Sequence, residues 1–265
     1  MRSLAWLVSI PMVAEAGEVL WSGFFNASAT IADFVKGSFS NEVGDWQWYI
    51  HGPAATEKYL GLSADNKNPA DTSDEQGIRI TIDGTSFWNG QDMERSEIIP
   101  QTNADLGSGH LFYHFSLKTE EANAPNASFE HQIAFFEVTT PLPKISKRPI
   151  ANKDTHHRAI SQSSNTAPQV GRREQTTPSA GNWYNFAYDI DFDMKTVGLW
   201  ASNGCDKLTQ VVSAVNASTA TDSADWHIGE LRLPKGGLDA APEDWFWSGI
   251  FVEKAPITAA IAGPA

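Results

Sequence analysis

The sequence contains almost no cysteine: Cys205 is the only one among 265 residues, so no disulfide can form within the chain. A protein of this length that lacks such crosslinks depends on a large buried core for its stability. Basic residues are also scarce, since 19 Lys and Arg stand against 32 Asp and Glu, a formal net charge of −13. That charge argues against nucleic acid and anionic membranes as partners. No group of residues has the spacing of a metal site, so we expect no metal and no other cofactor.

Helical periodicity and long apolar runs are nearly absent. Only residues 31–35 have a pattern that fits a helical turn. Apolar and polar side chains instead alternate along several short segments, which is typical of half-buried β-strands. The segments predicted as strands are residues 78–83, 111–117, 131–138, 184–193, 197–201 and 245–253. Many short strands joined by turns rich in Asn, Asp, Gly and Pro predict an all-β fold, a sandwich or jelly roll of two antiparallel sheets.

The N-terminus has the pattern of a secretory signal. Arg2 precedes a short apolar run, residues 4–13, which is too short to span a bilayer, and residues 14–16 supply a small-x-small cleavage pattern. We therefore predict that residues 1–16 are a signal peptide and that the protein is secreted to the extracellular space; a buried first strand is the alternative. Secretion agrees with three predicted glycosylation sites, at Asn26, Asn126 and Asn216.

One segment differs in composition from the rest of the chain. Residues 141–180 hold seven of the 19 Lys and Arg, only two acidic residues and no aromatic residue. Such a composition indicates a loop or disorder rather than a strand of a compact domain. We expect a single domain over residues 17–255 with an anomalous segment at 138–182, which is either a disordered insertion or a gene-model artefact. Residues 256–265 are expected to form a C-terminal tail.

The run FWNGQDMERSEIIPQ, residues 87–101, is the most informative part of the chain. Two aromatic residues and an Asn-Gly turn signal precede Arg95 and Glu97, which share a face if the run is a strand. An arginine beside a glutamate can hold an anion, orient a sugar or set the pKa of the carboxyl group. A surface ion pair that contributes little to stability is the alternative.

Seven segments spread in order over most of residues 17–254 carry a family resemblance. They are GEVLWSGFFN (17–26), WQWYIHG (46–52), NKNPADT (66–72), ITIDGTSFWNGQDMERSEIIPQT (80–102), EHQIAFFE (130–137), WYNFAYDIDFDMKTVGLW (183–200) and ADWHIGELRLP (224–234). Together they resemble the catalytic domain of fungal glycoside hydrolase family 131. The resemblance implies a β-jelly roll with an open substrate cleft on its concave sheet, related in fold to polysaccharide lyases such as glucuronan lyase. It also implies a β-glucanase that acts on β-1,3, β-1,6 and β-1,4 linkages, with β-glucan as its partner, and we expect a monomer.

The resemblance also assigns catalytic candidates. The glutamates of the RSE and HQIAFFE motifs are Glu97 and Glu137, and the histidine of the DWH motif is His227. Glycoside hydrolysis needs one protonated and one ionised carboxyl group. Two phenylalanines precede Glu137 and Arg95 stands near Glu97, so we expect Glu137 to be the acid and Glu97 the nucleophile or base. Glu137 as a structural acid and His227 as a core histidine are the alternatives.

Candidates for substrate binding come from the same motifs. Polar side chains that could contact sugar hydroxyls are those of Arg95, Gln91, His131 and Gln132, and aromatic platforms for sugar rings are Trp48, Tyr49 and Trp88. A polar pair such as His131 and Gln132 is as often a satisfied strand edge.

Two other functions stay open from the sequence. A polysaccharide lyase needs a base and a group that neutralises a carboxylate, which Arg95, His131, Gln132 and Tyr188 could supply. A carbohydrate-binding protein without activity is the other, because residues 138–182 do not resemble the aromatic strand segments that the family has there.

Overall fold

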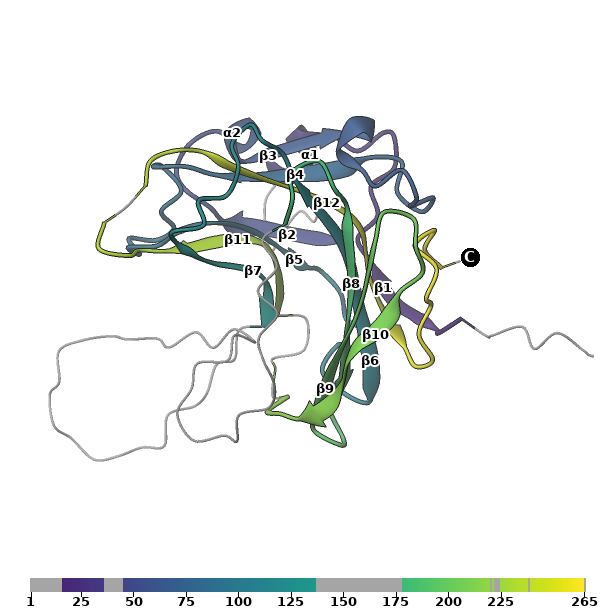
Figure 1. Ribbon diagram of the computed structural model, residues 1–265. Helices are drawn as coiled ribbons and strands as arrows, with labels where there is room; N and C mark the ends of the chain where they lie inside the picture. The colour runs from purple at the N-terminus through teal and green to yellow at the C-terminus, as the bar shows by residue number, and fades with distance from the viewer. Residues whose placement is uncertain are drawn as a thin grey trace, which may run out of the picture.

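The computed structural model describes residues 16–35, 45–136, 178–219, 221, 225–237 and 239–264. These residues form two antiparallel β-sheets packed face to face, with little helix, which confirms the predicted all-β sandwich (Figure 1). The smaller sheet has the order β2-β5-β11-β7, and the larger has the order β10-β9-β8-β6-β12-β4-β3 with β1 paired to β12. In Figure 1 the larger sheet curves from β3 and β4 at the top of the view to β9 and β10 at the bottom.

The smaller sheet consists of β2 (Trp46–Ile50), β5 (Glu94–Pro100), β7 (Glu130–Phe136) and β11 (Trp226–Leu233). The larger sheet consists of β1 (Val19–Ser22), β3 (Leu60–Ser63), β4 (Gly77–Ile82), β6 (His110–Thr119), β8 (Tyr184–Asp191), β9 (Thr196–Asn203), β10 (Thr209–Asn216) and β12 (Glu243–Lys254). The helical elements are α1 (Ile31–Val35), α2 (Thr56–Tyr59) and the 3-10 turn η1 (Ala64–Asn66). No helix among the described residues is long and apolar enough to cross a membrane.

The core lies between the two sheets and is rich in aromatic rings. Trp226 of β11 packs edge-on against Tyr113 of β6, with ring centroids 5.2 Å apart, and lies parallel to Phe136 of β7. Trp247 of β12 is fully buried and contacts Phe115 of β6. Each such side chain buries 150–250 Å² or so, and burial of this apolar surface is the main term that holds the sheets together.

The C-terminal tail belongs to the folded body. The backbone N–H of Leu208 donates to the carbonyl of Ala259 at 2.9 Å, and the hydroxyl of Thr72 donates to the carbonyl of Ala262 at 2.9 Å. The hydroxyl of Thr258 donates to Glu253 at 2.6 Å. Residues 256–264, predicted as a C-terminal tail, therefore pack on the domain. Most of the predicted signal peptide, 1–16, and of the segment 138–182 lies outside the described residues.

Candidate active site

Three polar side chains meet on the face of the smaller sheet that is turned away from the core. β5 and β11 are antiparallel neighbours in this sheet. Ile98 of β5 and Trp226 of β11 are in the core between the sheets, so alternation places Arg95, Glu97 and His227 on the opposite face. The predicted shared face of Arg95 and Glu97 is therefore present.

Glu97 is held by two partners. Nε of Arg95 donates to Oε1 of Glu97 at 2.6 Å, and Nη2 donates to Oε2 at 2.6 Å, which is the bidentate arrangement. Nδ1 of His227 lies 2.6 Å from Oε2. Arg95 and Glu97 are 0% exposed and His227 is 1% exposed. The alternative of a surface ion pair is therefore wrong, because the pair is fully buried.

The partners of Glu97 decide its charge. Burial alone raises the pKa of the Glu97 carboxyl group, but the charge of Arg95 and the hydrogen bond and charge of His227 outweigh it, so the pKa is lowered from its ordinary value. The Nε2 atom of His227 lies 3.1 Å from Oδ1 of Asp225, which places the imidazole between two carboxylates. The ring of Phe135 stacks on this imidazole with centroids 5.0 Å apart. The site therefore holds an ionised glutamate and a histidine fixed in orientation.

Gly229 lets β11 approach β5 at the site. It lies opposite Glu97 and has a φ of 150°. A Cβ atom at this position would lie 2.2 Å from the carbonyl oxygen of Ser96 and 2.8 Å from Cα of Glu97. Only glycine tolerates this approach, so the glycine of the HIGEL run is required by the geometry around Glu97.

The loop before β5 brings aromatic and amide groups to the site. The guanidinium carbon of Arg95 lies 5.5 Å from the centre of the Trp88 ring, and Nη1 of Arg95 donates to Gln91 at 3.3 Å. Tyr49 of β2 contacts Trp88 with ring centroids 6.0 Å apart. Tyr49, Trp88 and Gln91 are half-buried, so part of each faces solvent. Asn89 has a φ of 50°, which fits the predicted Asn-Gly turn.

Other predicted site residues lie elsewhere. Trp48 is 4% exposed and stacks on His51 within the core, because alternation along β2 turns it away from Tyr49; it therefore cannot present a face to a sugar. His131 turns toward the core side of the sheet, where Nε2 lies 2.7 Å from Glu243. Gln132 is half-buried on β7, and Glu137 lies outside the described residues.

Four further predicted residues are the lyase candidate Tyr188 and the three predicted glycosylation sites. The hydroxyl of Tyr188 donates to the carbonyl of Ala134 at 3.0 Å, and burial raises its pKa. Asn26 and Asn216 are exposed, whereas Nδ2 of Asn126 donates to Asp239 at 2.8 Å.

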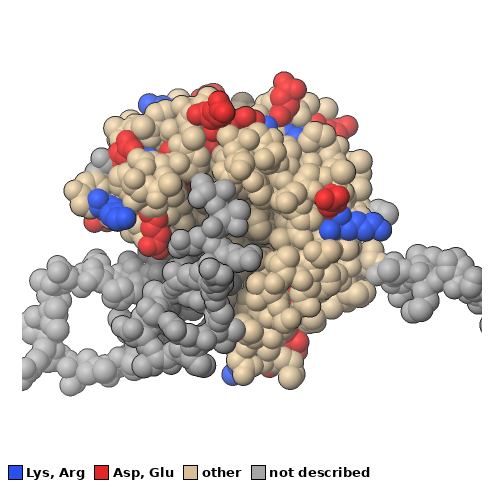
Figure 2. Space-filling model, in the orientation of Figure 1, with Lys and Arg blue, Asp and Glu red and all other residues tan. Residues whose placement is uncertain are grey.

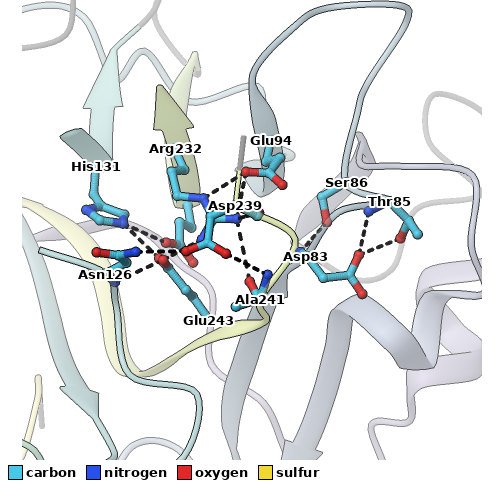
Figure 3. A network of polar contacts seen from close by, with 11 residues as sticks. Asp83, Thr85, Ser86, Glu94, Asn126, His131, Arg232, Asp239, Ala241 and Glu243 are labelled. Carbon is cyan, nitrogen blue, oxygen red and sulfur yellow. Dashed lines mark hydrogen bonds and ion pairs between the residues drawn. The ribbon is translucent and has the colours of Figure 1, made fainter. Parts of the chain in front are cut away.

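A second polar cluster occupies the core side of the same strands. Figure 3 shows His131, Arg232, Glu94 and Glu243 pointing toward one another from β7, β11, β5 and β12. Sequence reasoning found only His131 of this cluster and also missed Asp225, the partner of His227. The available signal was the charged run Gly229-Glu230-Leu231-Arg232, which places two charges on the inward face of a strand that otherwise reads as core.

Comparisons with known proteins place the chain among similar sequences and structures. The chain matches the family model of the glycoside hydrolase 131 catalytic N-terminal domain over residues 19–258. The crystal structure of the catalytic domain of a glycoside hydrolase family 131 protein from Coprinopsis cinerea is 44% identical, with a TM-score of 0.75 over 92% of this chain and 98% of that one. That of a GH131 beta-glucanase catalytic domain from Podospora anserina is 42% identical, with a TM-score of 0.77 over 93% of this chain and 100% of that one. No curated protein matches the chain.

Proposed function

Because the chain belongs to glycoside hydrolase family 131, we propose that it is a secreted β-glucanase that cleaves β-1,3, β-1,6 and β-1,4 glucosidic linkages. Its family makes it a glycoside hydrolase, and the relative from Podospora anserina is described as a beta-glucanase. The observation that carries the proposal for the chemistry is the bidentate contact of Arg95 with Glu97, reinforced by His227.

The proposed reaction uses Glu97 and Glu137 in opposite protonation states. Glu97 is ionised because Arg95 and His227 lower its pKa. It serves either as the nucleophile at C1 of the sugar or as the base that takes a proton from the attacking water. Glu137, which follows β7 in sequence, gives its proton to the oxygen of the leaving sugar. Asp225 and Phe135 position His227, which in turn orients Glu97.

Sugar rings would pack against the half-buried aromatic side chains beside this pair. The faces of sugar rings carry apolar C–H groups, which pack well on indole and phenol rings. Trp88 and Tyr49 can provide such a surface, since they contact each other and are partly open to solvent. We assign Gln91 and Gln132 to the sugar hydroxyls. Arg95 is a positioning residue, because its Nε and Nη2 atoms both donate to Glu97.

One assay tests the activity and its class. The mature protein is incubated with laminarin, pustulan, cello-oligosaccharides and polyglucuronate. New reducing ends from the three glucans, without the absorbance of unsaturated uronates, are expected. Absorbance of that kind from polyglucuronate would show a lyase, and binding without cleavage would show an inactive carbohydrate-binding protein; either result overturns the proposal.

Two substitutions test the residues. Glu97→Gln and Glu137→Gln are each expected to lower kcat/KM by about 10³-fold or more, as for the removal of a group that acts in the transition state. Glu130→Gln is the matched control, because Glu130 is an exposed glutamate at the start of β7. Activity near that of the wild type in either active-site variant would contradict the assignment.

We also propose that the protein is a monomer that carries N-linked glycans at Asn26 and Asn216. Both side chains are exposed, whereas the amide of Asn126 is engaged by Asp239. Expression in a eukaryotic secretory host, followed by enzymatic removal of N-glycans, should give a mass change that corresponds to two sites. A third glycan, at Asn126, would contradict this part of the proposal.

A further inference from the structure

We propose that His131, Glu230 and Glu243 form a binding site for one divalent transition-metal ion, such as Zn²⁺ or Mn²⁺, between the two sheets. Each of the three side chains offers one ligand atom, and these atoms all lie within 4.8 Å of one another. His131 comes from β7, Glu230 from β11 and Glu243 from β12. Figure 3 shows His131 and Glu243 pointing toward each other in this cluster. The site is distinct from that of Glu97, since it lies on the opposite face of β11.

Glu230 is the observation that points to a ligand. Its side chain is 0% exposed, and as an ionised carboxylate neither of its oxygens has a hydrogen-bond partner, whereas in its protonated form it hydrogen-bonds to Glu243. Nε2 of His131 lies 3.6 Å from Oε1 of Glu230, which is beyond hydrogen-bond distance. A buried carboxylate without a partner is costly, and such groups in native proteins are as a rule paired or bound to a metal. Glu230 is aimed into the cluster, and no cation is hydrogen-bonded to it.

The charges around Glu230 are not balanced by the protein. Arg232 donates to Glu94 at 2.7 Å and to Glu243 at 2.5 Å. Asp239 adds a fourth carboxylate at the rim of the cluster, near Arg232. Four carboxylates therefore surround one guanidinium and one imidazole, so a further cation is favoured here. A proton shared by Glu230 and Glu243 is the competing way to reduce the charge, in keeping with the raised pKa that burial gives Glu230.

The ligand types select the kind of ion. One imidazole nitrogen and two carboxylate oxygens suit Zn²⁺ and Mn²⁺, whereas Ca²⁺ prefers a set made of oxygen atoms alone. Nε2 of His131 already lies 2.7 Å from Oε2 of Glu243, so a small separation of the two groups would admit an ion bonded to both. The side chain of His131 is 13% exposed and Asp239 is half-buried, which leaves an approach from solvent.

A bound ion would join the two layers of the sandwich. β7 and β11 belong to the smaller sheet and β12 to the larger one. An ion bound to a ligand from each of these three strands would hold both sheets by direct bonds. Since such binding requires the folded arrangement, the ion would raise the stability of the domain by mass action.

Metal binding to the untagged full chain tests the site directly. The protein is stripped with EDTA, dialysed and titrated with ZnCl₂ and MnCl₂ by calorimetry, with the bound metal counted by mass spectrometry. One ion per chain is expected, together with a rise in Tm of about 5–10 °C at a hundredfold excess of free ion over Kd. CaCl₂ under the same conditions is expected to give a smaller shift. No stoichiometric binding of either transition metal would overturn the proposal.

Two variants separate this site from other histidines on the chain. Glu230→Gln, which keeps the shape of the side chain, is expected to abolish the bound ion and the rise in Tm. Glu253→Gln is the matched control: Glu253 is also buried and lies 2.9 Å from His114, but Thr258 satisfies its oxygens. Equal zinc binding by the two variants would contradict the site. X-ray absorption of the zinc-loaded wild type should show one imidazole nitrogen beside oxygen ligands, and ligation by oxygen alone would contradict it without any variant.

Discussion

The two faces of β5 and β11 both carry buried charges, but their partners differ. On the face turned away from the core, Glu97 receives two hydrogen bonds from Arg95 and one contact from His227, each at 2.6 Å. On the core face, Arg232 is shared between two other carboxylates and Glu230 receives no hydrogen bond. The exposed fraction of the side chain is at most 1% for all four charged residues, Arg95, Glu97, Glu230 and Arg232. The difference therefore lies in charge balance and not in burial.

Charge balance sets opposite pKa shifts on the two faces. Burial raises the pKa of both glutamates, but Arg95 and His227 reverse the effect at Glu97, whereas the neighbouring Glu243 adds to it at Glu230. A group that must be ionised for catalysis is thus supplied with cations by the protein. A glutamate without a hydrogen-bonded cation is left to bind a proton or, as proposed above, a metal ion.

The largest expected effect comes from removing the cation on the Glu97 side. Arg95→Met leaves Glu97 buried without its main partner, so we expect a loss of about 3–5 kcal/mol in the free energy of unfolding. The pKa of Glu97 should rise, which shifts the acidic limb of the pH dependence of kcat/KM to higher pH and lowers its maximum by about 10²-fold or more. Urea unfolding and pH-rate profiles on laminarin measure both effects.

Arg79→Met is the control for Arg95→Met. Arg79 lies 3.3 Å from Asp244, but its side chain is 27% exposed, so solvent screens the pair. We expect a loss below about 1 kcal/mol and an unchanged pH profile. Equal effects of the two substitutions would show that the buried ion pair of Arg95 with Glu97 contributes no more than a partly exposed one.

The next largest effect is expected at Gly229, where β11 comes closest to β5. Gly229→Ala places a Cβ atom against the backbone of Ser96 and Glu97 and should force β11 away from β5. We expect a cost of about 1–3 kcal/mol in stability and a lower kcat, because His227 moves relative to Glu97. Gly237→Ala is the matched control, since nothing lies within 4 Å of its added atom. A kcat unchanged in Gly229→Ala would show that the approach of the strands does not position the site.

A smaller effect is the opposite pH dependence of the contributions that Glu230 and Glu97 make to stability. Glu230 has a raised pKa, so its contribution to stability is complete below the unfolded value near 4.5 and is lost as the pH rises toward its folded pKa. Glu97 has a lowered pKa, so its contribution is present above 4.5 and is lost as the pH falls through its folded pKa. In EDTA, Glu230→Gln should therefore be close to neutral at pH 4 and become more stable than the wild type as the pH rises.

The free energy of unfolding from pH 3 to 8 measures this difference. Asp74, whose pKa burial beside Asp71 raises to about 8, contributes with the same sign as Glu230. Its contribution is common to both proteins and cancels in the difference between wild type and Glu230→Gln. A difference that stays constant over this range would contradict the assigned shift at Glu230.

The sequence predicted the outward face far better than the inward one. Arg95 and Glu97 are two residues apart, so alternation alone places them together, and the family resemblance adds His227 from a distant strand. Glu230 and Glu243 instead come from strands of different sheets, and no local spacing reveals that they meet.

Strand prediction succeeded where side chains alternate and failed where they do not. The segments 78–82, 111–117, 131–136, 184–191 and 197–201 alternate and are confirmed as strands, as is 245–253. β11 reads as irregular because polar and apolar side chains are buried on both of its faces. β10 was missed because it is an edge strand exposed along its whole length, so no core face imposes alternation on it.

The smallest expected effect comes from the loop before β5, which contacts Arg95 on the outward face of the smaller sheet. Trp88→Leu removes the ring 5.5 Å from the guanidinium of Arg95 but leaves the contacts of Arg95 with Glu97 in place. A cation–π contact of this kind contributes about 0.5–1 kcal/mol, so stability and the pH profile should change little. KM for glucans should rise by about tenfold, because a stacked ring contributes about 1.5 kcal/mol at most beyond its buried area. Phe87→Leu, one residue away and also half-buried, serves as the control, and an equal rise in KM in both variants would mean that loop packing rather than a sugar platform explains the effect.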